Sequence, residues 1–284
     1  MMPALRLPSA FIETEFLRLE YLTTTGPRIT GLYAKGVQGN LLAETPDVHW
    51  TTPHGEYYLR GGHRLWTAPE NPFYICPEGG LSVVENDSVT LKGGVDASGL
   101  EKQITIHMDG NCVRLSHRVT WHGNDPVELA PWGITQLRLG GLCILPLTSS
   151  AGGLAPNRNL VLWPYSQTHD ERLELHNDMI LLHGEAAEQP MKIGNLNTHG
   201  WVAYALSDAL FVKRFDIGNA AFPDMGCNVE AYVWDKFIEL EILGSIKILN
   251  RNESVTMDET WEVIPGQYSA SPETARIISG QLGK

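Results

Sequence analysis

The sequence predicts an all-β protein, folded as a large antiparallel β-sandwich with a short helix near its C-terminal end. Polar and apolar residues alternate over many short stretches, and turn residues separate these stretches at short intervals. Amphipathic windows with helical spacing are almost absent, which excludes the alternating strand and helix order of doubly wound and barrel folds. About fifteen short strands are therefore expected.

Each strand is predicted from the alternation of apolar and polar residues along it and from the turn residues that follow it. Residues 16–22 (FLRLEYL) alternate between apolar and polar side chains, as in a strand with one buried face. Asp109-Gly110 lies between residues 103–107 and 112–117 and predicts a tight hairpin, because glycine adopts positive φ at no steric cost. Further hairpin turns are predicted at four sites: Asn86-Asp87, Asn177-Asp178, Ser207-Asp208 and Asp235-Lys236.

One helix is predicted, at residues 271–280. Ser271 can cap its first turn and Pro272 suits its first position, while Gly280 can end it. Its apolar residues are Ala275, Ile277 and Ile278.

The 284 residues contain no Pro/Gly/Ser-rich linker, charge run or fixed-period repeat. A single domain over residues 1–284 is expected, with its core at about 16–265. A sheet with many antiparallel strands twists and curls, so one face should be concave and suited to an elongated polar ligand.

Charge and hydropathy exclude two classes of partner. The formal net charge is −12 and Lys and Arg form no cluster, so we expect no nucleic-acid partner. The N-terminus has no apolar signal region and no stretch is long enough to span a membrane, so a cytoplasmic protein without a membrane partner is expected. The sequence leaves the oligomeric state open.

No metal and no cofactor are expected. The four cysteines are scattered without C-x-x-C spacing, and the ten histidines match no familiar set of metal ligands. The sequence also lacks a nucleophile elbow, a phosphate-binding glycine loop and the H-E-x-x-H motif. Any chemistry must come from looser groups of residues.

The first such group lies at residues 61–70 (GGHRLWTAPE), which place His63, Arg64, Trp66 and Glu70 after a Gly-Gly turn. Arg64 can hold sugar hydroxyls through several N–H donors. A loop-bracing ion pair of Arg64 with Glu70 or Glu78, with Trp66 in the core, is the structural alternative.

The second group spans residues 222–230 (FPDMGCNVE) and 239–244 (ELEILG). Period two sets Asn228 and Glu230 on one face of a strand, and Glu239 and Glu241 on one face of the next. Clustered carboxylates raise at least one pKa, as an acid and base pair requires. The alternative is a strand whose solvent face is acidic.

Four segments in this order resemble a family of the galactose mutarotase-like superfamily, DUF4380: residues 63–70, 222–230, 239–244 and 259–261 (ETW). The resemblance extends from about residue 16 to 265. It implies the β-supersandwich of that superfamily, which aldose 1-epimerases, hexose-6-phosphate epimerases and non-catalytic glycosidase domains share, with sugar bound on the concave face.

The resemblance also implies roles for single residues. Leu240-Glu241 is similar to the mutarotase pair that carries the base, so Glu241 is the candidate base, supported by Glu239 and Glu230. Residues 131–137 (PWGITQL) are similar to the segment that carries the acid, and Trp132 stands in place of its histidine. An indole cannot donate a proton at neutral pH, so His63 is the candidate substitute and Trp132 can stack on a sugar ring.

The sequence therefore predicts a protein that binds a small-molecule carbohydrate. Arg64, Trp66, Trp132, Asn228, Glu230 and Glu239 are expected to line the groove, with His63 at its edge. Whether the protein is an enzyme stays open at this point. The first hypothesis is an aldose 1-epimerase-like isomerase, the second is a non-catalytic sugar-binding module, and the third is an all-β interaction domain.

Overall fold

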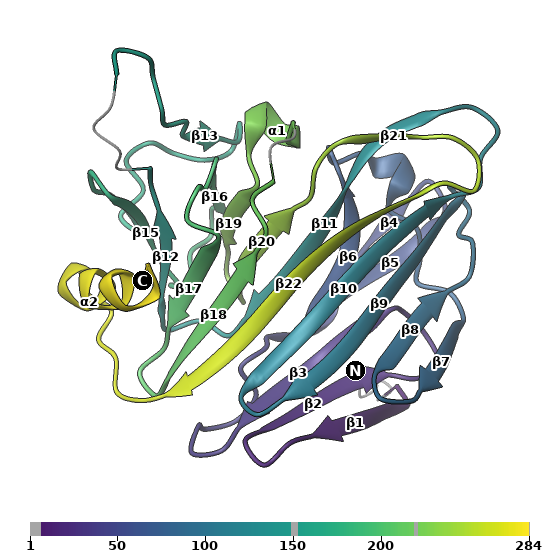
Figure 1. Cartoon of the computed structure of the whole chain (residues 1–284), viewed down its shortest axis with the longest axis horizontal. Coiled ribbons are helices and arrows are strands. Elements are labelled where there is room, and N and C mark those ends of the chain that lie inside the picture. Colours follow the sequence, from purple (N-terminus) through teal and green to yellow (C-terminus); the bar gives the residue numbers. More distant parts are fainter. Residues whose placement is uncertain (1–6, 149–152, 219–220, 284) are drawn as a thin grey trace.

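The computed structural model describes residues 7–148, 153–218 and 221–283. Two large antiparallel sheets pack against each other, and β22 crosses the front layer diagonally with β10 and β9 beside it (Figure 1). The predicted all-β sandwich with a short C-terminal helix is confirmed. No helix within the described ranges is long and apolar enough to cross a membrane.

The first sheet holds ten strands. Nine follow one another in the order β1 (Ser9–Glu13), β2 (Leu17–Leu22), β3 (Arg28–Ala34), β6 (His63–Ala68), β11 (Val127–Leu137), β20 (Ile238–Leu243), β19 (Val229–Val233), β16 (Met191–Asn195) and β13 (Val161–Leu162). The tenth, β21 (Lys247–Leu249), pairs with the first part of β11.

The second sheet also holds ten strands. Their order is β14 (Leu173–Leu175), β15 (Met179–His183), β12 (Leu142–Pro146), β17 (Trp201–Ala205), β18 (Ala209–Phe215), β22 (Ser254–Pro265), β10 (Cys112–Trp121), β9 (Leu100–Asp109), β8 (Val89–Gly93) and β7 (Leu81–Glu85). The main apolar core fills the space between the two sheets.

All five predicted hairpin turns join antiparallel neighbours. Asp109-Gly110 links β9 to β10, and Gly110 has the positive φ of +58° that the turn requires. The other four turns link β7 to β8, β14 to β15, β17 to β18 and β19 to β20. The described residues form 22 strands rather than the expected fifteen or so, because segments of two or three residues such as β13 and β14 carry no readable alternation.

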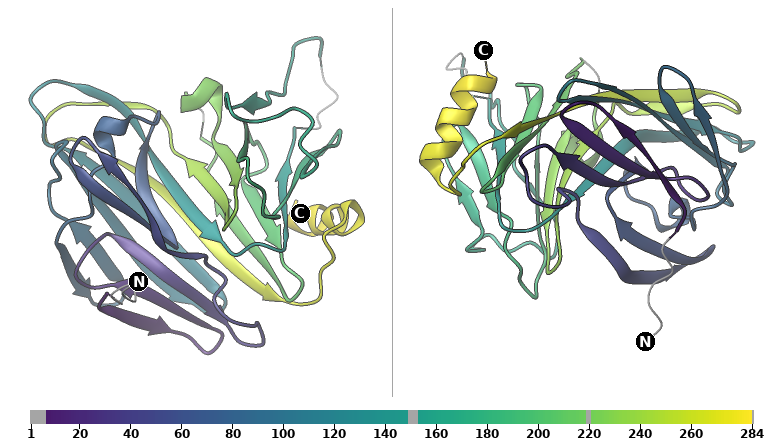
Figure 2. Two further views of the ribbon diagram at one scale, coloured as in Figure 1. Left: turned by 180° about the vertical axis from the view of Figure 1, so that it is seen from behind. Right: turned by 90° about the horizontal axis from the view of Figure 1, so that it is seen from below.

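The C-terminal helix α2 (Pro272–Leu282) packs on the outside of the second sheet, at the end of the molecule away from β1 to β3 (Figure 2). The Ser271 side chain accepts a hydrogen bond from the Thr274 backbone N–H, as predicted for its cap. Ala275 and Ile278 are buried, whereas Ile277 is exposed. The predicted end at Gly280 is wrong, because the helix continues to Leu282 and is capped by Gly283.

A separate hairpin of β4 (Glu44–Thr52) and β5 (Gly55–Gly61) leads into the first sheet. The Gly61-Gly62 turn has φ values of +84° and +70°, and a Cβ on Gly62 would lie 2.0 Å from the Ile29 carbonyl oxygen. This close approach brings Tyr57 of β5 against the ring of Trp66. The hairpin therefore forms one wall beside β6.

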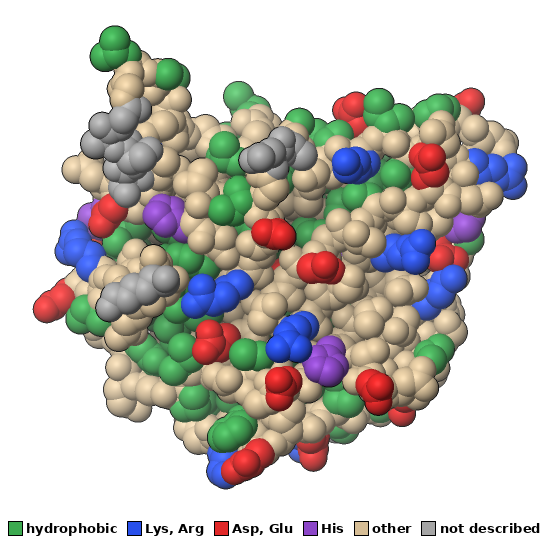
Figure 3. Space-filling view, in the orientation of Figure 1, with side chains coloured by type: hydrophobic (Ala, Val, Ile, Leu, Met, Phe, Trp, Pro, Cys, Tyr) green, Lys and Arg blue, Asp and Glu red, His purple; other side chains and the backbone are tan. Residues whose placement is uncertain are grey.

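Two short helical segments complete the described elements. A 3-10 turn, η1 (Pro72–Tyr74), follows β6, and α1 (Pro223–Gly226) precedes β19. On the face shown in Figure 3, acidic and basic side chains lie interspersed, so the net negative charge is not gathered there.

Candidate functional site

The candidate site lies on one face of the first sheet. Arg64 of β6 is opposite Ile134 of β11, Ile134 is opposite Glu241 of β20, and Glu241 is opposite Glu230 of β19. Directly opposed residues on adjacent antiparallel strands point to the same face. We call this surface the candidate face. The predicted sharing of a face by Glu239 and Glu241 on one strand and Glu230 on the next is therefore present.

A lysine joins the two central carboxylates. The Lys192 ammonium, from β16, lies 2.7 Å from Glu230 Oε2 and 2.9 Å from Glu241 Oε2. The Trp132 indole N–H donates to the same Glu241 oxygen at 2.8 Å. Glu230 and Glu241 are both fully buried, so the alternative of a solvated acidic face is wrong. A buried ion group of this kind is stable only when its charges are paired.

One carboxylate oxygen of this group remains available. Glu241 Oε1 is buried and has no hydrogen-bond partner among the residues that the structure describes. Buried polar atoms are nearly always satisfied by protein, water or ligand. Glu241 Oε1 is therefore the carboxylate oxygen of the candidate face at which a polar ligand would be held.

Burial and the neighbouring charges shift the pKa values of Glu230 and Lys192. Burial raises the pKa of Glu230 well above its ordinary value, and the Glu241 charge raises it further while Lys192 opposes the rise. Burial alone would lower the pKa of Lys192, but Glu241 and Glu230 raise it above its ordinary value. One ammonium cannot neutralise two carboxylates, so the surroundings favour the protonated form of Glu230 and the charged form of Lys192.

Asp224 approaches the same group from the loop before β19. Asp224 and Met225 have φ values of +49° and +61°, which non-glycine residues adopt at a steric cost. Burial raises the pKa of Asp224, and a hydrogen bond with Glu230 lowers it in part. The strained loop thus places a third carboxyl group beside Glu230.

Arg64 is held at one end of the candidate face. Its Nη2 donates to Glu239 Oε1 at 3.0 Å, and its guanidinium carbon lies 4.5 Å from the centroid of the Trp66 ring. The alternative pair of Arg64 with Glu78 does not form, because Glu78 bonds Arg28 and Arg60 instead. Gln136 also donates to Glu239 Oε1, at 2.9 Å.

The remaining donors of Arg64 are unused. Its Nε and Nη1 atoms are buried and have no hydrogen-bond partner among the described residues. A cavity of about 330 Å³ lies beside Arg64 and Trp66, with Tyr57 and Glu78 in its walls. Burial raises the pKa of Glu239, and Arg64 opposes this rise. The guanidinium is therefore positioned by Glu239 and Trp66 and keeps the N–H donors of two nitrogen atoms for a ligand.

Trp66 and Trp132 form the aromatic part of the candidate face. Their rings meet edge to face at 5.8 Å. The Lys192 ammonium lies 4.6 Å from the centroid of the Trp132 ring and 4.5 Å from that of Trp163. Trp132 thus positions Lys192 and Glu241, and Lys192 covers one face of its ring.

Asn228 has a different task. Its Oδ1 accepts a hydrogen bond from the Asn197 backbone N–H at 2.7 Å, and its Nδ2 donates to the Asn197 carbonyl at 2.9 Å. Its side chain is buried. The amide therefore fixes the segment between β16 and β17 rather than presenting both its polar groups to a ligand.

His63 lies on the opposite face of β6. Neighbouring residues of a strand point to opposite sides, so His63 faces the interior between the two sheets while Arg64 faces out of it. Its ring contacts Thr135, His117 and Glu259, and it is fully buried. The structure does not bring His63 to the candidate face.

Lys192, Trp163 and Asp224 were not predicted as site residues from the sequence. Lys192 stands within a strand whose other residues are all buried. A lone charged residue in such an apolar run is the signal that would have found it. Trp163 and the backbone strain at Asp224 carry no comparable signal, because both depend on contacts between distant segments.

Comparison with known proteins places the fold. No model of a known protein family matches this sequence, and no curated protein matches it. Solved structures match over nearly the whole chain. A candidate aldose 1-epimerase from Escherichia coli K12 has a TM-score of 0.57 at 14% identity, over 91% of this chain and 99% of its own.

Two further structures show the same likeness. A galactose mutarotase-like protein from Lactobacillus casei has a TM-score of 0.56 at 10% identity, with 90% of this chain and 100% of its own covered. A TPR-domain containing protein from Parabacteroides distasonis has a TM-score of 0.64 at 10% identity, with 92% of this chain and 48% of its own covered. The fold is thus shared by a stand-alone protein and by part of a larger one, so fold alone does not fix the activity.

Proposed function

We propose that this protein binds a sugar on the candidate face and interconverts its two anomers, with Glu241 as the general base. The observation that carries the proposal is the buried group of Glu230, Glu241 and Lys192, in which Glu241 Oε1 has no hydrogen-bond partner among the described residues. Sugars offer hydroxyl donors to such an oxygen and hydroxyl acceptors to the free N–H groups of Arg64. The fold shared with mutarotase-like proteins supports this substrate class.

The acid in this proposal is Glu230, since His63 faces the sheet interior. Glu241 takes the proton of the anomeric hydroxyl while Glu230 gives its proton to the ring oxygen, and the bond between the anomeric carbon and the ring oxygen breaks. The open aldehyde turns about its bond to the next carbon and closes on its other face. Both protons then return, so no net proton is gained or lost.

The other predicted residues hold the sugar in this proposal. Arg64 binds ring hydroxyls through Nε and Nη1, Trp66 supplies apolar surface, and Glu239 positions Arg64. Trp132 holds Glu241 and Lys192 in place. Asn228 supports the site through the backbone of Asn197. The narrower assignment to DUF4380 rests on the four sequence motifs, and a cytoplasmic location stays a prediction.

The test of this proposal is anomer exchange measured on the wild-type protein. We expect catalytic amounts to speed magnetisation transfer between the α and β anomers of at least one aldose in a panel of neutral and phosphorylated sugars. Polarimetry checks the rate independently. A sugar that raises the melting temperature without faster exchange would favour the second candidate, a non-catalytic sugar-binding module. That candidate is supported by Trp132, which stands in place of an acid.

The pH profile tests the role of Glu230 separately. Because the acid must be protonated, we expect the exchange rate to fall as pH rises through the raised pKa of Glu230. The Glu230→Gln variant should lose both most of the rate and the alkaline limb of the profile. If the alkaline limb is unchanged in this variant, another residue is the acid.

A further inference from the structure

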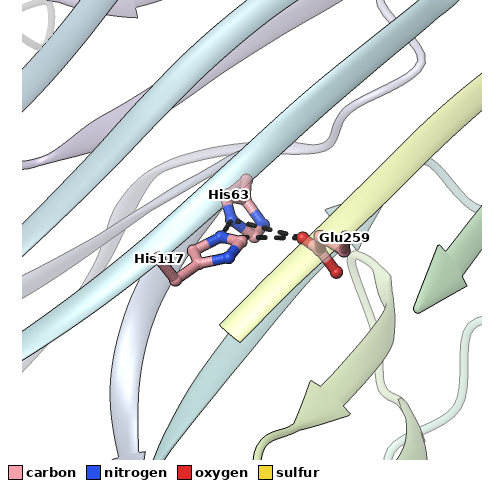
Figure 4. A group of neighbouring side chains, drawn as sticks. All are labelled: His63, His117 and Glu259. Carbon is pink, nitrogen blue, oxygen red and sulfur yellow. Dashed lines mark hydrogen bonds and ion pairs between the residues drawn. The ribbon is translucent and has the colours of Figure 1, made fainter. Parts of the chain in front are cut away.

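A second polar cluster lies in the interior between the sheets, on the other side of β6 from the candidate face. His63 of β6, His117 of β10 and Glu259 of β22 point toward one another (Figure 4). The two Nε2 atoms are 2.7 Å apart, and each lies 3.7 Å from Glu259 Oε1. All three side chains are buried. The proposed function uses none of these groups.

We infer that His63 Nε2, His117 Nε2 and Glu259 Oε1 form a binding site for a divalent transition-metal ion of the zinc type. Bonds of about 2.0–2.1 Å in tetrahedral geometry put ligand atoms roughly 3.4 Å apart. The observed separations of 2.7 and 3.7 Å lie on either side of that value, so small side-chain rotations close the site. Two imidazoles and one carboxylate leave a fourth position for water.

The outer hydrogen bonds of both rings suit this role. His117 Nδ1 lies 3.2 Å from the Met257 carbonyl oxygen, and His63 Nδ1 lies 2.9 Å from Thr135 Oγ1. A ring that donates from Nδ1 presents the lone pair of Nε2 to a metal. Trp261 Nε1 donates to Glu259 Oε1 at 3.1 Å and fixes the carboxylate. Each ligand is therefore already oriented by a neighbour.

The positive charge of Lys213 limits which metal ions can bind at this site. Its ammonium lies 2.9 Å from Glu259 Oε2 and 3.0 Å from Thr135 Oγ1, and it repels any cation beside it. Mg²⁺ and Ca²⁺ prefer oxygen ligands and gain little from two imidazoles. Zn²⁺, Co²⁺ and Ni²⁺ gain most from imidazole nitrogen, so they are the class that can bind against this charge.

The position of the cluster between the sheets has a structural consequence. A cavity of about 510 Å³ between β18, β20 and β22 has Met257 and Glu259 in its lining. The three ligands come from both sheets, since β6 is in the first and β10 and β22 are in the second. An ion here ties the two layers together directly behind Arg64.

The test uses chelator-treated wild-type protein with Zn²⁺ or Co²⁺ alone. We expect about one ion per chain to remain after desalting, a rise of several degrees in melting temperature, and visible absorption from tetrahedral Co²⁺. The His117→Asn variant should lose ion, absorption and thermal shift. The matched control replaces His176 and His183, which flank Glu174 nearer the surface, and should keep all three.

Two results would overturn the site. Wild-type protein that retains less than about a tenth of an ion per chain and shows no thermal shift has only a hydrogen-bonded cluster. Loss of binding in the His176 and His183 variant instead would place the ion at the surface. If His117→Asn does not fold, the Co²⁺ spectrum of the wild type and this control still decide. None of these readouts requires sugar turnover.

Discussion

Replacing Glu241 with glutamine is expected to lower the anomer exchange rate about 10²- to 10⁴-fold, the range that one general base contributes. The amide keeps the shape of the side chain and can still accept the Trp132 hydrogen bond at its oxygen. It cannot take up a proton from the anomeric hydroxyl. The loss should therefore appear in kcat, measured by magnetisation transfer at saturating sugar.

The matched control is Glu239→Gln, two residues along the same strand and on the same face. Glu239 bonds Arg64 and Gln136 rather than Lys192, so its loss should mainly raise KM by loosening the guanidinium. Equal kcat values in wild type and Glu241→Gln would refute Glu241 as the base. If Glu241→Gln and Glu239→Gln lowered kcat equally, the candidate face would only hold the sugar in place, and Glu241 would have no separate role as a base.

Replacing Lys192 with methionine should destabilise the protein by about 3–5 kcal/mol, the usual cost of removing one partner from a buried ion group. The change leaves Glu230 and Glu241 buried beside each other without a counter-charge. Urea unfolding measures the free energy of unfolding. As a control, Lys236→Met on the exposed turn between β19 and β20 should stay within about 0.5 kcal/mol of wild type.

The loss of stability in Lys192→Met should be larger at high pH than at low pH. Burial and the nearby Glu241 charge raise the pKa of Glu230, and the variant lacks the Lys192 ammonium that opposes this rise, so its folded state binds more protons than its unfolded state above the unfolded pKa of Glu230. Stability is then retained at low pH and falls as pH rises through the raised pKa of Glu230. Adding Glu230→Gln should restore part of the lost stability at pH 7. A variant as stable as wild type at pH 7 would show that the ion group is solvated.

The local sequence predicted the features that depend on residues close together in the chain, such as hairpin turns and the register of the two strands they join. The Asp235-Lys236 turn sets Glu230 opposite Glu241, because a tight hairpin fixes the register of its own two strands. The same alternation of side chains along a strand places the neighbours His63 and Arg64 on opposite faces. The prediction that both lie at one groove did not take this into account. Lys192 and Trp163 come from distant parts of the chain, and no local pattern gives the order of strands in a sheet.

The place of β22 in the second sheet has a consequence for synthesis. This strand, Ser254–Pro265, lies between β18 and β10 and pairs with both along most of its length. A nascent chain that has not yet delivered these residues therefore exposes two long unpaired strand edges on the ribosome, and such edges template aggregation. The second sheet can therefore close only after residues 254–265 have been synthesised, and its two edges need protection until then.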